Sequence, residues 1–108
     1  MKRGDTVIMV AQGDLGRPRP AVIVQTDELS DATSVLLCPI TSEITDRLPI
    51  RPIVEADETN GLRVRSQIMT DKMLALSRNR VRRVIGRINS EASGRLDTAL
   101  LLVLGLAR

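Results

Sequence analysis

The 108-residue sequence contains no histidine, phenylalanine, tyrosine or tryptophan, and it has a single cysteine, Cys38. Without histidine, the chain has no imidazole for acid–base catalysis, for a Ser-His-Asp triad or for binding a metal. Without aromatic rings, it lacks the stacking platforms on which many proteins bind single-stranded nucleic acid. One cysteine excludes an internal disulfide and a thiolate metal cage, and it is typical of a reducing compartment. A thiol nucleophile at Cys38 is not expected, because no histidine is there to activate it.

Long apolar runs are also absent, and none reaches the length of a membrane span. The N-terminus starts with the polar residues Lys2, Arg3 and Asp5 rather than with a signal peptide. These features predict a soluble cytoplasmic protein with no membrane partner. With 43% hydrophobic and 27% charged residues, the chain has enough apolar residues for a core, and its length predicts one domain over residues 1–108.

Charge is distributed unevenly, although the net charge is only +3. Residues 20–62 carry a net charge of −6, whereas residues 63–87 carry +7, with Asp71 as the single acid of the second segment. Fourteen of the 16 basic residues are arginine, whose planar guanidinium suits bidentate binding of phosphate. The pattern favours a polyanionic partner, and a solvated basic face is the alternative interpretation.

Short apolar segments separated by turn residues dominate the first four-fifths of the chain. They predict strands at residues 6–10, 21–24, 34–40, 50–54, 62–70, 73–76 and 81–88. Pro52 marks the fourth of these as an edge or bulged strand, because proline has no N–H to donate to a neighbour. Asn60-Gly61 predicts a two-residue turn between the fourth and the fifth strand.

The last segment predicts a helix that begins after an N-cap at Asn89 or Ser90 and stops near Gly105. Its apolar residues at helical spacing are Leu96, Ala99, Leu100, Val103 and Leu104. Leu101 and Leu102 widen this apolar stripe beyond the needs of one small domain, and a homodimer is the simplest explanation. Many short strands followed by one helix predict a mainly β fold, a small and strongly bent β-barrel with a C-terminal α-helix.

Several short segments follow one another along the whole chain. They are Lys2-Arg3-Gly4-Asp5, Arg19-Pro20-Ala21-Val22-Ile23-Val24-Gln25, Val35-Leu36-Leu37-Cys38-Pro39-Ile40-Thr41-Ser42, Gly61-Leu62, Ser66 to Lys72 and Ile85-Gly86-Arg87-Ile88. In this order they resemble the MazF/PemK family of toxin ribonucleases. The resemblance implies an SH3-like barrel that dimerises and cleaves single-stranded RNA, mRNA included, with no metal or other cofactor. It also implies a type II toxin–antitoxin system, in which a small acidic antitoxin of the MazE/PemI type neutralises the toxin.

Matched by position, the resemblance implies catalytic roles for Arg19, Thr41 and Asp71. Arginine is a poor proton donor at neutral pH, so Arg19 is expected mainly to stabilise the negative charge of the reacting phosphate, with proton donation to the leaving group as the secondary role. Thr41 is expected to position the phosphate or the attacking hydroxyl, since no base is there to make it a nucleophile. Asp71 is either a general base or an ion-pair partner of Arg65 or Lys72.

Four further residues are expected to bind RNA, and they are Arg17, Ser42, Arg65 and Lys72. The sequence also departs from the family pattern. Where relatives often carry Asp-Gln-Val-Arg-Thr, this chain has Ser66-Gln67-Ile68-Met69-Thr70, so one acid and one arginine are missing. A catalytically silent nucleic-acid- or protein-binding barrel is therefore the alternative function. A poison of DNA gyrase like the CcdB branch is disfavoured, because that branch acts through a C-terminal Trp-Gly-Ile and this chain has no tryptophan.

Overall fold

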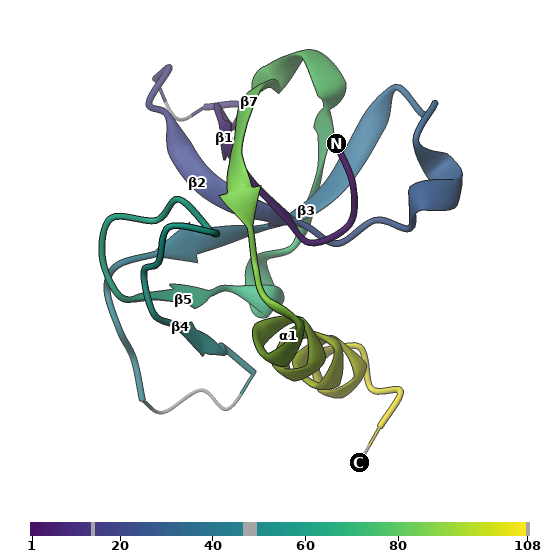
Figure 1. Ribbon diagram of the computed structural model, residues 1–108. Helices are drawn as coiled ribbons and strands as arrows, with labels where there is room; N and C mark the ends of the chain where they lie inside the picture. Colours follow the sequence, from purple (N-terminus) through teal and green to yellow (C-terminus); the bar gives the residue numbers. More distant parts are fainter. Residues whose placement is uncertain (14, 47–49, 108) are drawn as a thin grey trace.

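The computed structural model describes residues 1–13, 15–46 and 50–107 (Figure 1). Its strands are β1 (Asp5–Met9), β2 (Arg19–Ile23), β3 (Ser34–Thr41), β4 (Ile53–Val54), β5 (Ser66–Ile68), β6 (Leu74–Ser77) and β7 (Val81–Arg87). Short 3₁₀ turns, η1 (Asp27–Leu29), η2 (Thr70–Lys72) and η3 (Arg78–Arg80), connect some of them, and the helix α1 (Ser90–Val103) follows β7. No helix among the described residues is long and apolar enough to span a membrane.

The strands form one antiparallel sheet in the order β4-β5-β3-β2-β1-β7, and β6 pairs with β3 outside this path. The long strand β3 pairs with three strands, because residues 37–39 pair with β2, residues 34–37 pair with β6, and Ile40 and Thr41 pair with β5. The sheet therefore curls into a half-barrel, with α1 below it in Figure 1. The predicted class, a mainly β fold of strongly bent strands with one C-terminal helix, is confirmed.

Apolar residues fill both sides of the central strands β2 and β3. One cluster packs Val22 and Cys38 against Leu96 of α1, and the other packs Ala21 and Leu37 against residues of β1 and β6. Because successive residues of a strand point to opposite faces, a strand buried on both faces needs an almost continuous apolar run. This requirement explains the unbroken segments 21–24 and 35–38 of the sequence.

The helix begins where the sequence predicts, with Asn89 as the N-cap residue whose side-chain oxygen accepts the N–H of Ala92 at 2.8 Å. It ends at Val103, and Gly105 follows with a φ of +74°, a conformation that favours glycine. Of the apolar residues at helical spacing, Leu96, Ala99 and Leu100 are buried, whereas Leu104, which follows the last helical residue, is 54% exposed.

The region between β4 and β5 corrects two predicted strands and one predicted turn. Residues 50–54 contribute only Ile53–Val54, and residues 62–70 contribute only Ser66–Ile68. Asn60-Gly61 is not a two-residue hairpin turn but part of a loop over residues 55–65. The reason is the buried side chain of Asn60, which donates to the Glu55 carbonyl at 2.9 Å and accepts the Leu62 N–H at 3.0 Å. These bonds satisfy the polar groups of a wide loop, so a tight hairpin does not form.

This loop lies directly against β7 at two glycines. Gly61 has a φ of +69°, and a Cβ placed on it would lie 2.3 Å from the carbonyl oxygen of Ile85. A Cβ on Gly86 would lie 2.3 Å from the carbonyl oxygen of Thr59. Two backbones therefore meet at van der Waals distance, and a side chain at either position would push them apart.

We predict that Gly86→Ala destabilises the protein by about 1–3 kcal/mol, because the new methyl group meets rigid backbone atoms. Gly94 on the outside of α1 is the matched control, since a Cβ there would have no atom within 4 Å. Gly94→Ala should stabilise by about 0.5–1 kcal/mol through helix propensity. Urea unfolding of both variants measures the difference, and equal stability of Gly86→Ala and the parent would contradict this account of the loop.

Candidate active site

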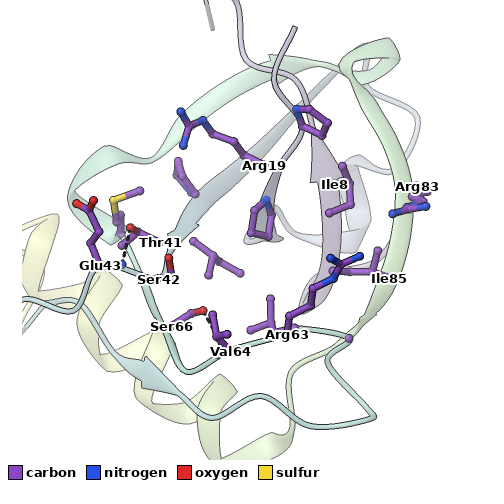
Figure 2. A pocket seen from close by; sticks show the side chains of 17 residues that line it. Ile8, Arg19, Thr41, Ser42, Glu43, Arg63, Val64, Ser66, Arg83 and Ile85 are labelled. Carbon is purple, nitrogen blue, oxygen red and sulfur yellow. Dashed lines mark hydrogen bonds between the residues drawn. The ribbon is translucent and has the colours of Figure 1, made fainter.

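A pocket of about 660 Å³ opens on the concave side of the half-barrel, between the 61–64 segment and strands β1, β2, β3 and β7 (Figure 2). Its floor is apolar, and its polar side chains are Arg19, Thr41, Ser42, Glu43, Arg63, Ser66 and Arg83. With three arginines and one glutamate, the charged side chains of this lining sum to a net charge of +2. We refer to it as the main pocket. Its charge and its size suit an anionic ligand larger than a single ion.

The register of the sheet builds the floor of the main pocket. Ile8 of β1 lies opposite Pro20 on one side and opposite Arg83 on the other. Strands β2 and β3 pair Ala21 with Pro39, and the next residue of each strand toward the pocket, Pro20 and Ile40, belongs to its lining. Residues of four neighbouring strands therefore line the pocket from β7 to β3.

Arg19 is the first residue of β2 and Thr41 is the last residue of β3, and the two strands pair in antiparallel register with Ala21 opposite Pro39. Both side chains line the main pocket, and Figure 2 shows them on the same side of it. The structure thus brings together two of the three residues for which catalytic roles are predicted. The prolines beside Arg19, Pro18 and Pro20, also line the pocket and restrict the backbone that carries its side chain.

Thr41 ends β3 and begins a turn in which its hydroxyl oxygen accepts the backbone N–H of Glu43 at 3.1 Å. A hydroxyl that accepts one hydrogen bond still has its own proton to donate. The turn fixes the Thr41 oxygen at the pocket wall and leaves that proton available for a ligand oxygen. Ser42 and Glu43 line the same wall. The sequence analysis missed Glu43, although its position two residues after Thr41 was a usable signal.

The third predicted catalytic residue, Asp71, does not line the main pocket. Its carboxylate accepts two hydrogen bonds from the guanidinium of Arg51, at 2.8 and 2.9 Å. The bond from Arg51 holds the pKa of Asp71 below its usual value. Asp71 is thus an ion-pair partner of Arg51 rather than of Arg65 or Lys72, and its predicted role as a general base stays a prediction.

The predicted RNA-binding residues are not all in one place. Ser42 lines the main pocket, whereas Arg17, Arg65 and Lys72 are exposed outside its lining. Arg65 forms an ion pair with Glu55 at 2.9 Å. RNA binding by these residues stays a prediction.

Two pocket arginines, Arg63 and Arg83, were missed as individual residues by the sequence analysis. Both lie within the segment 63–87, whose net charge of +7 was the available signal. Met69 lines the pocket at the position where the resembled family often has an arginine.

Cys38 and the acidic residues offer no other obvious chemistry. Cys38 is fully buried, and burial raises the pKa of its thiol to about 12, so it stays protonated and unreactive at neutral pH. Within the part of the chain that the structure describes, no three residues among Asp, Glu and Cys are placed to hold a metal ion together.

Comparison with known proteins decides the family. Residues 2–104 match the sequence profile of the family described as "PemK-like, MazF-like toxin of type II toxin-antitoxin system". The chain belongs to this family. It is 35% identical over 108 residues to a probable endoribonuclease MazF of Mycolicibacterium smegmatis, with 99% of each chain covered. It is 30% identical to endoribonuclease MazF9 of Mycobacterium tuberculosis, over 82% of this chain and 79% of that one.

Solved structures of toxins from the same family share the fold. The toxin MazF-mt6 of Mycobacterium tuberculosis superposes with a TM-score of 0.79 at 25% identity, over 94% of this chain and 99% of the other. A mycobacterial endoribonuclease in complex with its cognate antitoxin superposes with a TM-score of 0.81 at 17% identity, over 100% and 98% of the two chains. The resemblance found in the sequence to the MazF/PemK toxins is confirmed.

The Asp71–Arg51 pair makes a testable contribution to stability. Because the pKa of Asp71 is lowered in the folded protein, its contribution is fully present above the ordinary aspartate pKa of about 3.9. It is lost as the pH falls through the lowered pKa. We expect Asp71→Asn to cost about 1 kcal/mol at pH 7, with a difference from the parent that disappears in acid.

The control is Glu55→Gln, which removes an ion pair whose side chains are far more exposed, 58% for Arg65 and 73% for Glu55. Thermal and urea unfolding at a series of pH values measure both variants. A stability loss for Asp71→Asn that is the same at all pH values would show that the ion pair is not its source.

Proposed function

We propose that this toxin-family protein is an endoribonuclease that cleaves single-stranded RNA, mRNA included, in the cytoplasm without a bound metal. The observation that carries the proposal is that Arg19 and Thr41, from the ends of two paired strands, line one pocket together with Arg63 and Arg83. The chain's membership of the PemK-like, MazF-like family supports it, as do relatives named endoribonucleases. The protein groups that take part in the proposed reaction, Arg19, Thr41 and Glu43, all line this pocket.

The reaction begins with the ribose 2′-hydroxyl of the substrate. Its oxygen attacks the adjacent phosphorus, a new P–O2′ bond forms and the P–O5′ bond breaks, which leaves a 2′,3′-cyclic phosphate and a 5′-hydroxyl. Arg19 binds the non-bridging oxygens, where negative charge develops, and the Thr41 hydroxyl donates to one of them. These bonds are strongest in the transition state, so they lower the barrier rather than merely hold the substrate.

The 2′-hydroxyl must lose a proton and the 5′-oxygen must gain one. Arginine cannot accept a proton, and its pKa above 12 makes it a poor donor. Glu43 is the carboxylate in the lining of the main pocket, and it lies two residues after Thr41, so we assign it the accepting role. Solvent water gives a proton to the departing 5′-oxygen, and the resulting hydroxide takes the proton that Glu43 has accepted. Asp71 is the competing assignment, and its lowered pKa together with its bonds to Arg51 makes it a weaker base.

The proposal includes two partners. A cognate acidic antitoxin of the MazE/PemI type would complement the arginine-rich segment, and solved relatives are described as complexes with an antitoxin. A second copy of the chain would cover the leucines that the fold leaves exposed at the end of α1. Leu101, Leu102 and Leu104 are 45%, 39% and 54% exposed, and this supports a homodimer.

A silent RNA-binding barrel is the second candidate function, and Met69 is the observation that favours it. A thioether stands in the pocket lining where many relatives place an arginine, so one charge for stabilising the transition state is missing. Such a protein would bind single-stranded RNA at the main pocket and leave it intact.

The first experiment incubates the purified protein with a long unstructured RNA in excess EDTA and maps the ends of the products. We expect cleavage at defined sites, cyclic phosphate at the 3′ ends and hydroxyl at the 5′ ends. RNA that is bound but not cut would select the silent barrel. Cleavage that EDTA abolishes and magnesium restores would overturn the proposed metal-free mechanism.

The second experiment measures cleavage rates of five pocket variants and of Asp71→Asn. Arg19→Ala should lose about a hundredfold or more, and Arg19→Lys nearly as much, because a point charge does not reproduce the bidentate fork. Thr41→Ala should lose less, and Thr41→Ser should keep most activity. If Glu43 is the base, Glu43→Gln flattens the acid limb of the pH–rate profile whereas Asp71→Asn leaves that profile unchanged.

Each variant is first compared with the parent in melting temperature and in sedimentation, where a dimer has about twice the 11.8 kDa mass of the chain. This control separates lost chemistry from lost fold. If folded Arg19→Ala and Thr41→Ala both cut RNA at the parental rate, the proposed site is wrong. If Asp71→Asn alone shifts the pH–rate profile, the base is Asp71 and the assignment to Glu43 fails.

A further inference from the structure

The main pocket has a second group of positive charges at the end away from Arg19 and Thr41. Arg63 comes from the loop between β4 and β5, and Arg83 comes from β7. Figure 2 shows the two side chains on one side of the pocket, with Arg19, Thr41 and Glu43 on the other. The pocket therefore carries arginine side chains at both ends, with Glu43 beside Arg19 at one of them.

Among the described residues, these two arginines form no ion pair, whereas five other arginines do. The ion pairs that form among the described residues use Arg3, Arg51, Arg65, Arg87 and Arg95. Arg63 and Arg83 form no ion pair with any described residue, and both are exposed. The acid that lines the pocket, Glu43, lies at the opposite end (Figure 2). Positive charge at this end is thus not neutralised within the described part of the chain.

The backbone positions of Arg63 and Arg83 are fixed relative to each other. Gly61, two residues before Arg63, packs against the Ile85 carbonyl, two residues after Arg83. The buried Asn60 adds to this contact, because its carbonyl accepts the Thr6 hydroxyl at 2.6 Å. A charge pair carried on such a rigid frame loses less entropy when it binds an anion than a pair on a mobile loop.

Between these two ends, the pocket is lined by the apolar residues Ile8, Pro20 and Ile40. A matching ligand has two anionic groups separated by an uncharged part, and consecutive phosphates of RNA are separated by a nucleoside. Resting on the proposed function, we infer that Arg63 and Arg83 bind the phosphodiester next to the one that is cleaved. They act as positioning residues, and in a chain without aromatic rings they replace base stacking as the means of fixing the strand.

The test compares Arg63→Gln and Arg83→Gln with Arg82→Gln, which removes the same charge from an exposed neighbour on β7 outside the pocket lining. We expect each pocket variant to raise KM for RNA cleavage roughly threefold to fivefold, with kcat within about twofold of the parent. Each should also flatten the slope of log affinity against log salt by about 0.7, the share of one phosphate contact on a single strand. Arg82→Gln should change neither quantity.

A second measurement uses oligonucleotides made non-cleavable by a 2′-deoxy sugar at the cleaved position, with and without a phosphate at each flanking nucleotide. In the parent, one added flanking phosphate should tighten binding, and in the Arg63→Gln/Arg83→Gln double variant it should have no effect. The inference is overturned if Arg82→Gln behaves like the pocket variants, or if the added phosphate tightens binding equally in the double variant.

Failure of this inference is distinguishable from failure of the proposed function. If the parent cleaves RNA and the pocket variants keep its KM, only the inference is wrong. If the parent does not cleave RNA, binding is measured with an unstructured oligouridine. Loss of salt-dependent binding in the two pocket variants alone then supports the phosphate site in a silent RNA-binding barrel, and equal binding by all variants overturns it.

Discussion

The antiparallel pairing of β2 with β3 is the interaction on which the rest of the structure depends. Both faces of this pair are buried, so its register decides which apolar residues meet α1 and which meet β6. The same pairing brings the strand ends that carry Arg19 and Thr41 to the main pocket. A slip by one residue would turn the apolar residues of one strand to the other face. The packing of the core and the geometry of the candidate site are therefore fixed by one set of backbone hydrogen bonds.

The loop over residues 55–65 adds the opposite wall of the pocket, and it depends on polar contacts rather than on apolar burial. Asn60 is 1% exposed, and its amide bonds replace the strand pairing that a short hairpin would have made. Two glycines, Gly61 and Gly86, allow the loop to lie on the backbone of β7. The wall that carries Arg63 is thus held by backbone contacts with β7, the strand that carries Arg83.

The parts of the fold that the sequence predicts correctly are those governed by local patterns. The apolar runs at 21–24 and 34–40 and the capped helix after Asn89 are examples, because burial and capping each leave a direct trace in the sequence. The loop around Asn60 was missed since Asn-Gly is equally suited to a tight turn, and only tertiary contacts show that this asparagine is buried. Arg19 and Thr41 were found through resemblance. Their position in one pocket depends on how β2 pairs with β3, and no local pattern of the sequence shows that pairing.

Sorting the arginines by their partners explains how a modest net charge of +3 can produce a strongly cationic pocket. Arg51 and Arg87 are neutralised by Asp71 and Asp5, and Arg78 donates to the carbonyl of Ala32, so these side chains hold the fold together. Those that line the main pocket face Glu43 as the acid among the described lining residues. Five acids among the described residues form ion pairs with arginines outside the lining of this pocket, so those acids do not reduce its positive charge. In a chain without histidine, arginine supplies that charge at every pH where RNA is stable, so the pH dependence of cleavage must come from a carboxylate or from the substrate hydroxyl itself.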